Sequence, residues 1–311
     1  MNIKDMKRQL AVAAVSVVMA AIALSSATYA WFVTNSHVDA TTSTISAKTN
    51  NMVLQIVQGD TPDHGGKAST VAFDKGHEIS PSSTNDAKTW HVPETWKATD
   101  VKTYKVANVD VDGKYGDGNG KSFYAYTLAN YTLYTVKNTG KADVYLDGSQ
   151  GSPITVTKST DASDAWFNKI KGSLRVGILI NGELRLVYAP FEPSGHGNDV
   201  GHTVDGWSCV DPESLSSTMA PTYDHLAADK LVDGDGYNWA SEKVGDTYVK
   251  PTGNAKAIAK GVDYNGVNMK VVIWMEGTDA DCQNMNGLEP DDANPTFDVT
   301  LSLAGVAADS N

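Results

Sequence analysis

Apolar residues recur at every second position along most of this chain of 311 residues, which is the spacing of a strand with one buried face. Two C-terminal segments show this most clearly, one with Met269, Val271, Ile273 and Met275, the other with Phe297, Val299, Leu301 and Leu303. Helical spacing is confined to the short segment 163–170. The pattern therefore predicts a mainly β fold with at most short helices.

The clearest neighbouring strands are 174–180 and 184–188, which flank Asn181-Gly182-Glu183. A two-residue turn would pair Ile180 with Glu183 and bring charge into the core. A three-residue loop pairs Ile180 with Leu184 instead and keeps the apolar residues on one face. We therefore expect a bulged hairpin here.

Further strands are predicted at 52–57 and at 123–136, the latter pairing with 144–146 across a turn at 137–141. Two long polar stretches, near 59–121 and 192–262, are rich in Gly, Pro, Asp and Ser. Stretches of this length are typical of insertions that decorate the ends of a sandwich, with short strands of their own.

The N-terminus has the order of an export signal. Three basic residues precede an apolar run at 10–24, and small residues follow, with Thr28 and Ala30 where a signal peptidase reads and Trp31 as the new N-terminus. The run is shorter than the roughly 20 residues that span a bilayer, although retention as an anchor is the alternative. The chain therefore divides into a signal at 1–30 and a β-sandwich domain at 31–311.

The net charge excludes some classes of partner, and the cysteine content bears on the compartment. The net charge is −12, and removing the signal, with three bases and one acid, makes it −14. Such an acidic surface argues against nucleic acid as a partner. Both cysteines, Cys209 and Cys282, lie in the exported part, where a disulfide between them is expected.

Two groups of residues suggest ligands. Asn108, Asp110 and Asp112, followed by Gly113, place oxygen atoms at every second residue, as in the first half of a calcium loop, but Asn119 stands where that loop needs a Glu. A hydrated turn is the favoured reading, and calcium remains a possible cofactor. Trp207 and Trp239 lie in Gly/Asp-rich stretches, where exposed rings could stack on sugars, so a carbohydrate-binding adhesin is an alternative function.

The residues Ala27-Thr28-Tyr29-Ala30-Trp31-Phe32 and the strand-like segment after them resemble the TasA and camelysin group of Gram-positive surface proteins. The segments Tyr134–Gly140, Leu174–Pro190 and Ile273–Cys282 are similar to strand and loop elements of relatives that carry such signals. The resemblance implies processing by a SipW-type signal peptidase, a jelly-roll-like antiparallel β-sandwich, and a secreted structural protein of the cell surface or biofilm matrix.

Camelysin-like relatives are described as metalloproteases, which raises the question of catalysis. A zinc protease needs two histidines one helical turn apart with a glutamate beside the first. His77-Glu78 comes nearest, but Pro81 stands where the second histidine would be. We therefore expect no enzyme and no catalytic residues, and keep the protease as the weakest alternative.

In TasA-type fibres the N-terminal strand of one subunit completes a sheet of the next. Here the Ser/Thr-rich segment 31–48 is β-prone and carries Trp31, Phe32, Val38 and Ile45 as candidate anchors of a donor strand. Head-to-tail addition does not close on itself and makes filaments, so the chain itself is the expected partner, with matrix or wall glycans as further candidates. The alternative is that this segment is the first strand of its own domain.

Overall fold

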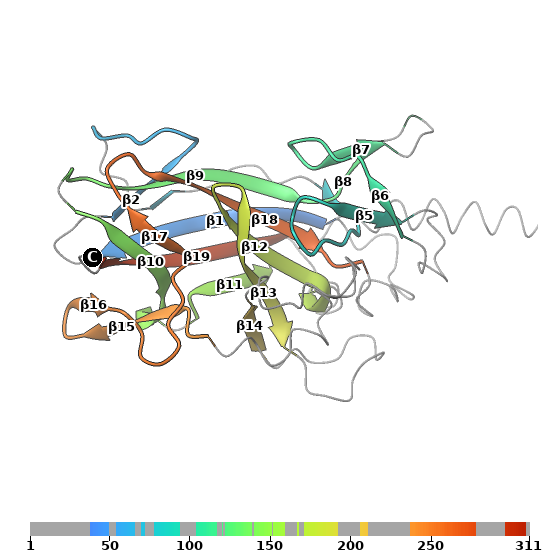
Figure 1. Cartoon of the computed structure of the whole chain (residues 1–311). Coiled ribbons are helices and arrows are strands. Elements are labelled where there is room, and N and C mark those ends of the chain that lie inside the picture. The colour runs from blue at the N-terminus through green and yellow to red at the C-terminus, as the bar shows by residue number, and fades with distance from the viewer. Residues whose placement is uncertain are drawn as a thin grey trace, which may run out of the picture.

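The computed structural model describes residues 38–49, 54–65, 70–71, 78–93, 104–116, 120, 122–138, 140–150, 152–158, 167, 171–191, 206–210, 237–277 and 296–308. These residues form two large sheets and two small hairpins (Figure 1). The mainly β, sandwich-like fold predicted from the alternating pattern is confirmed. Helical structure among the named elements is limited to two 3-10 turns, η1 (Gly148–Gln150) and η2 (Lys171–Ser173).

The nine-stranded sheet follows the order β16 (Thr247–Val249), β15 (Ala240–Val244), β10 (Ala142–Asp147), β19 (Thr296–Ala307), β1 (Val38–Thr49) and β3 (Thr70–Val71). Three more strands attach to this path: β11 (Ile154–Lys158) to β19, β17 (Ala259–Val262) to β10, and β4 (Glu78–Ile79) to β1. Most pairs are antiparallel, but β1 runs parallel to β19, and β15 runs parallel to β10.

The six-stranded sheet follows the order β14 (Gly206–Val210), β13 (Glu183–Phe191), β12 (Leu174–Ile180), β18 (Val267–Met275), β9 (Thr127–Thr135) and β2 (Leu54–Gln58), with every pair antiparallel. The small hairpins are β5 (Trp90–Pro93) with β6 (Tyr104–Ala107), and β7 (Lys114–Gly116) with β8 (Ser122–Tyr124).

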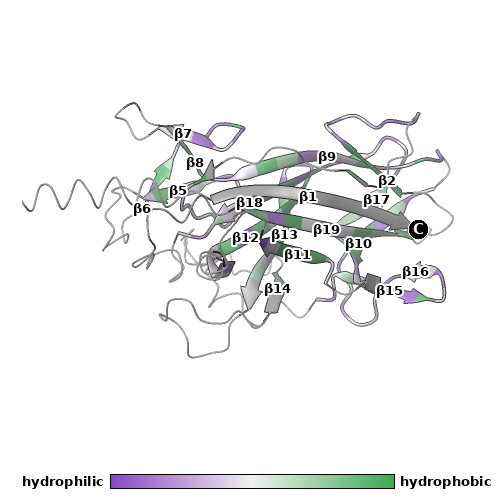
Figure 2. Cartoon of the chain, turned by 180° about the vertical axis from the view of Figure 1, so that it is seen from behind, coloured by the Kyte–Doolittle hydropathy of each residue, from purple (hydrophilic) through white to green (hydrophobic). Residues whose placement is uncertain are grey.

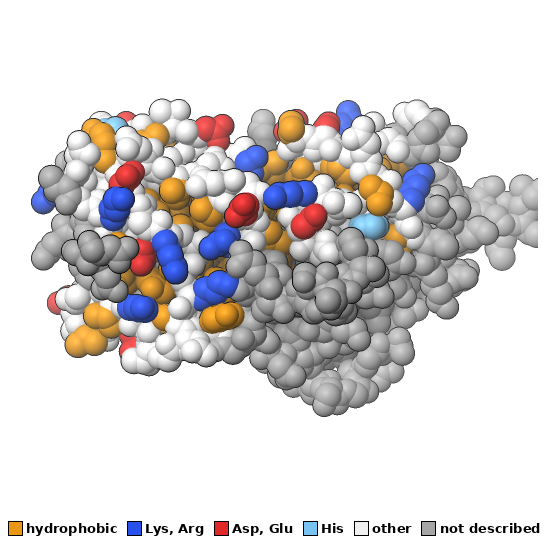
Figure 3. Space-filling view, viewed as in Figure 1, with side chains coloured by type: hydrophobic (Ala, Val, Ile, Leu, Met, Phe, Trp, Pro, Cys, Tyr) orange, Lys and Arg blue, Asp and Glu red, His pale blue; other side chains and the backbone are white. Residues whose placement is uncertain are grey.

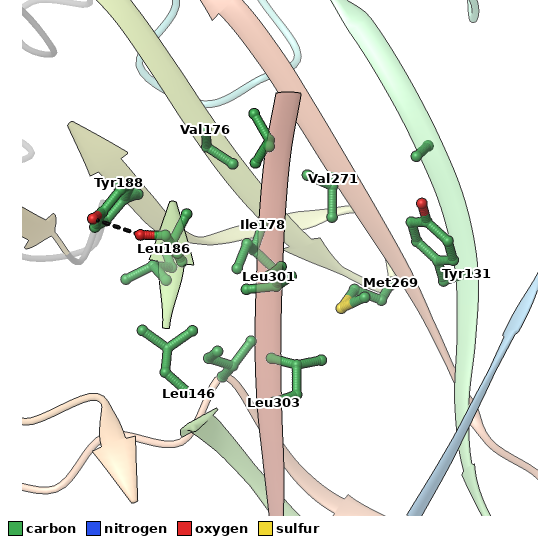
Figure 4. Close-up of a cluster of buried hydrophobic side chains, with 14 of the residues drawn as sticks. Tyr131, Leu146, Val176, Ile178, Leu186, Tyr188, Met269, Val271, Leu301 and Leu303 are labelled. Atoms are coloured by element: carbon green, nitrogen blue, oxygen red, sulfur yellow. Dashed lines mark hydrogen bonds between the residues drawn. The ribbon is translucent and has the colours of Figure 1, made fainter. Parts of the chain in front are cut away.

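The main core lies between the two large sheets. Side chains of β10 and β19 face those of β12, β13, β18 and β9, and Figure 4 shows Leu301 and Leu303 among Ile178, Leu186 and Met269. Hydrophobic residues follow these strands, while the β15–β16 and β7 turns carry hydrophilic ones (Figure 2). Tyr188 of β13 ties the sheets together, because its hydroxyl donates to Ile154 O of β11 at 2.9 Å. The period-two pattern thus produces one interior shared by both sheets.

A second hydrophobic cluster covers the outer face of the six-stranded sheet. Val272 and Trp274, which alternate along β18 with the core residues, pack there with Trp90 and Tyr115 of the small hairpins. Gly177 of β12 makes room for the Trp274 ring, since an added Cβ would lie 3.0 Å from it. Both faces of β18 are therefore buried.

This cluster changes the interpretation of the first polar insertion. Its hairpins β5–β6 and β7–β8 cover a sheet face and do not merely decorate an end of the sandwich. Ser82 fixes the insertion, with its hydroxyl donating to Ala125 O at 2.5 Å, and the Tyr104 hydroxyl donates to Gly277 O beyond β18. The second insertion likewise supplies strands to both sheets, including β14 and β17. The composition of the insertions did not predict these contacts, because few of the residues that make them are aliphatic.

The predicted loop of the 174–188 hairpin is wrong in length. Asn181 and Gly182 form a two-residue turn with φ of 51° and 82°, and Ile180 pairs with Glu183. The register then shifts, because Leu179 pairs with Leu184 and Ile178 with Leu186. The expected bulge is present, but it lies inside β13. Leu184 can face the outer cluster because that face of the sheet is also covered.

Two other sequence predictions differ from the structure or fall outside it. The expected pair 123–136 with 144–146 does not form, because β9 joins the six-stranded sheet and β10 the nine-stranded one. The intervening turn therefore crosses between the sheets. The predicted helix at 163–170 lies outside the described residues except for Phe167, which packs against the main core.

Candidate functional site

The N-terminal strand β1 lies inside the nine-stranded sheet, beside β19 on one edge and the short strands β3 and β4 on the other. Figure 1 shows β1 and β19 side by side along the sandwich. They pair in parallel from Asp39 opposite Thr296 to Thr49 opposite Gly305, with one irregularity between Thr42 and Thr44. The first described strand of the chain is thus aligned with the last one.

β1 is paired along both of its edges. Ten of its positions pair with β19, and the described strands β3 and β4 supply two pairs each. In these short pairs Ile45 lies opposite Val71, and Val38 lies opposite Ile79. Ile79 is fully buried, and Val71 packs against the core. In the described residues, the outer edge of β1 is thus paired near both of its ends, at Val38 and Asp39 and at Ile45 and Ser46.

On its inner edge β1 borders a core strand. Phe297, Val299, Leu301 and Leu303 of β19 are each at most 1% exposed. Removing β1 would therefore open the edge of a strand whose side chains belong to the centre of the molecule, and such an edge accepts another strand through main-chain hydrogen bonds.

Of the predicted donor residues, Val38 and Ile45 lie in β1, while Trp31 and Phe32 lie outside the described residues. The same holds for the predicted signal residues Thr28 and Ala30. In this single chain β1 completes its own sheet, as the second of the two alternatives expected. Transfer of β1 to another copy of the chain stays a prediction.

The predicted calcium residues lie between β6 and β7. Asp110 Oδ1 accepts hydrogen bonds from the backbone N–H of Asp112 at 3.0 Å and of Lys114 at 2.8 Å. Gly113 has a φ of 89°, which fits its place in this turn. Burial, with Asp110 and Asp112 nearby, raises the pKa of Tyr126, whose hydroxyl donates to Asp110 O. Asp110 therefore stabilises a turn, and calcium binding at this turn stays a prediction.

Of the predicted sugar-stacking residues, Trp239 is only 4% exposed and belongs to the main core. The expectation that its ring is exposed is wrong, because the ring packs among the side chains of the main core. Tyr237 is the ring that reaches solvent, at 43% exposure. Trp207 lies in β14 opposite Pro190, and its side chain is outside the described part.

The predicted disulfide is not formed at Cys209. This residue lies in β14 opposite Tyr188, and its half-buried thiol packs against the main core. Cys282 lies outside the described residues. The strand pairing of β14 thus explains the burial of the thiol without a covalent link.

In the described part of the chain, no group of three or more His, Cys, Asp or Glu side chains is placed to hold a metal ion. His77 lies outside this part, and Pro81 is in a buried segment beside β4. Nor do the described residues include a helix that is both long and apolar enough to cross a membrane.

Comparison of the chain with protein-family models, with curated proteins and with solved structures gives no match. The resemblance to the TasA and camelysin group therefore stays a prediction from the quoted sequence segments.

Proposed function

We propose that the chain is a secreted structural protein of a Gram-positive cell surface or matrix, and that its copies join by exchanging β1. A SipW-type peptidase would release the exported chain at Trp31. The observation that carries the proposal is the parallel pairing of β1, the first described strand, with the core strand β19 at ten positions.

Exchange needs no new type of contact. The main-chain hydrogen bonds between β1 and β19 are the same whether one chain or two supply the strands, so local concentration and strain in the connection decide which form prevails. If each chain gives its strand to the next, the contact is heterologous and extends into a filament.

Negative-stain microscopy tests the proposal. The exported chain, residues 31–311, should form filaments, and a version that lacks residues 31–48 should not. A synthetic peptide of residues 31–48 should bind the shortened chain and raise its melting temperature, whereas a scrambled peptide should not. Filaments from the shortened chain, or failure of the peptide to bind, would contradict strand exchange.

A further inference from the structure

A short ribbon beside β17 presents one aromatic ring to solvent. Residues 237–239 pair with residues 254–256, since Asn238 N–H donates to one backbone carbonyl of that segment at 2.8 Å and Asn238 O accepts from a backbone N–H at 3.0 Å. Trp239 anchors the ribbon in the main core, while Tyr237 remains 43% exposed. The backbone that carries the exposed Tyr237 ring is therefore held in place.

One cation lies over this ring, and two more act on that cation. Lys256 Nζ lies 4.7 Å from the centre of the Tyr237 ring and 5.6 Å from that of Trp239, within cation–π range. Burial lowers the pKa of Lys256, and the like charges of Arg185 and Lys260 lower it further. The positive charges therefore lie close enough to repel one another, and an anion that contacts them would relieve this repulsion.

The bulge in β13 places Arg185 here. The residues before and after Arg185 pair with Leu179 and Ile178, so Arg185 is the extra residue of the bulged strand. Bulges redirect side chains and are common beside functional sites. The guanidinium lies 4.0 Å from Glu183, and the two side chains are 27% and 69% exposed, so the ion pair is partly open to solvent and weak. Another anion that reaches the guanidinium would therefore compete with a weakly held carboxylate.

Figure 3 shows several Lys and Arg side chains, with a few Asp and Glu between them, on the face that carries β17 and the β12–β13 hairpin. The whole chain has 25 basic and 37 acidic residues. A polyanion is therefore repelled by the molecule as a whole and must be held by a local group of cations.

We propose that Arg185, Lys256 and Lys260, together with Tyr237, bind an anionic polysaccharide. The guanidinium and the two ammonium groups contact its phosphate or carboxylate groups through charge-assisted hydrogen bonds. The Tyr237 ring packs against the apolar face of a sugar. The exposed ring favours a saccharide over an acidic protein surface as the occupant. This binding goes beyond the structural role and does not depend on strand exchange.

The test measures binding of the monomeric fraction of the exported chain to immobilised polygalacturonate, poly(glycerol phosphate) and neutral dextran. The variant K256Q/K260Q should bind the anionic polymer about tenfold more weakly at low salt. The matched control K105Q/K114Q removes the same charge from exposed residues of β6 and β7 and should change binding by less than about twofold. Binding to polygalacturonate supports an anionic polysaccharide, whereas binding to poly(glycerol phosphate) alone would show that the face takes a phosphate chain without sugar rings and would overturn the saccharide.

A further variant, Y237A, separates the ring from the charges. It should weaken binding to polygalacturonate, which contains sugar rings, and leave binding to poly(glycerol phosphate) unchanged. The proposal is overturned if the two double variants lose binding equally, if dextran binds as well as the anionic polymers, or if neither anionic polymer binds. Loss of self-association in K256Q/K260Q, without any polymer binding, would assign this face to a second copy of the chain. Because the assay uses monomers, its result stands whether or not filaments form.

Discussion

Replacing Trp90 with alanine should strongly destabilise the protein, although Trp90 belongs to a polar insertion. Its side chain is 3% exposed, and its ring lies 4.6 Å from that of Tyr126 and 5.8 Å from that of Trp274. A buried tryptophan replaced by alanine costs about 3–5 kcal/mol through lost burial and the cavity left behind. Since domains of ordinary stability unfold at about 5–15 kcal/mol, this is a large share of the total.

Urea unfolding, followed by circular dichroism and by tryptophan fluorescence, measures the loss. With an m value of about 3 kcal/mol/M for a chain of this size, the midpoint should fall by about 1–1.7 M. The control is Val106→Ala in the partner strand β6, where the side chain is 64% exposed and the change should stay within about 0.5 kcal/mol. If Trp90→Ala were as mild as this control, the second hydrophobic cluster would not be part of the stable core.

Two further substitutions test local contacts by thermal or urea unfolding. Tyr188→Phe should cost about 1 kcal/mol through the lost hydrogen bond to Ile154 O. Burial raises the pKa of Tyr188 to about 12 from 10.0, so the neutral phenol stabilises the fold below pH 10, and this stabilisation is lost as pH rises through 12. The Tyr188→Phe variant should therefore lose less stability at alkaline pH than the unchanged protein. An equal loss of stability would refute the assignment. Gly113→Ala should destabilise the protein by roughly 2–3 kcal/mol, because the added Cβ would lie 2.5 Å from Tyr126 O. The control Gly253→Ala has a similar φ but open space around the added Cβ, and should cost only about 1 kcal/mol. Equal losses of stability would contradict the close contact at Gly113.

Alternation along the sequence predicted most of the strands because strand geometry itself has a period of two. The core residues Met269, Val271, Ile273 and Met275 all lie on one face of β18. The other face, with Val272 and Trp274, is buried as well, because an insertion distant in the sequence covers it, and alternation alone does not show this. The same hidden layer explains why the expected loop at Asn181–Glu183 was one residue too long.

Local patterns in the sequence could not predict which distant segments pair with each other. A turn-like stretch at 137–141 fits a hairpin as well as a crossing between sheets, and tertiary packing selects the crossing. The parallel pairing of β1 with β19 joins opposite ends of the chain. At the candidate sites, alternation places Tyr237 and Trp239 on the same face, and only the fold shows that Trp239 reaches the core while Tyr237 stays exposed. Arg185, Lys256 and Lys260 come together only through the fold.

The most direct test of strand exchange is a disulfide between β1 and β19. Ser46 lies opposite Ser302 in the parallel register, and neighbouring strands bring Cα atoms within reach of a disulfide. The variant S46C/S302C, made with Cys209 and Cys282 replaced by serine, is oxidised after assembly and run on a non-reducing gel. Strand exchange predicts a ladder of cross-linked chains from the filament fraction and single cross-linked chains from the monomer fraction. Cross-links confined to single chains in every fraction would show that β1 stays in its own sheet.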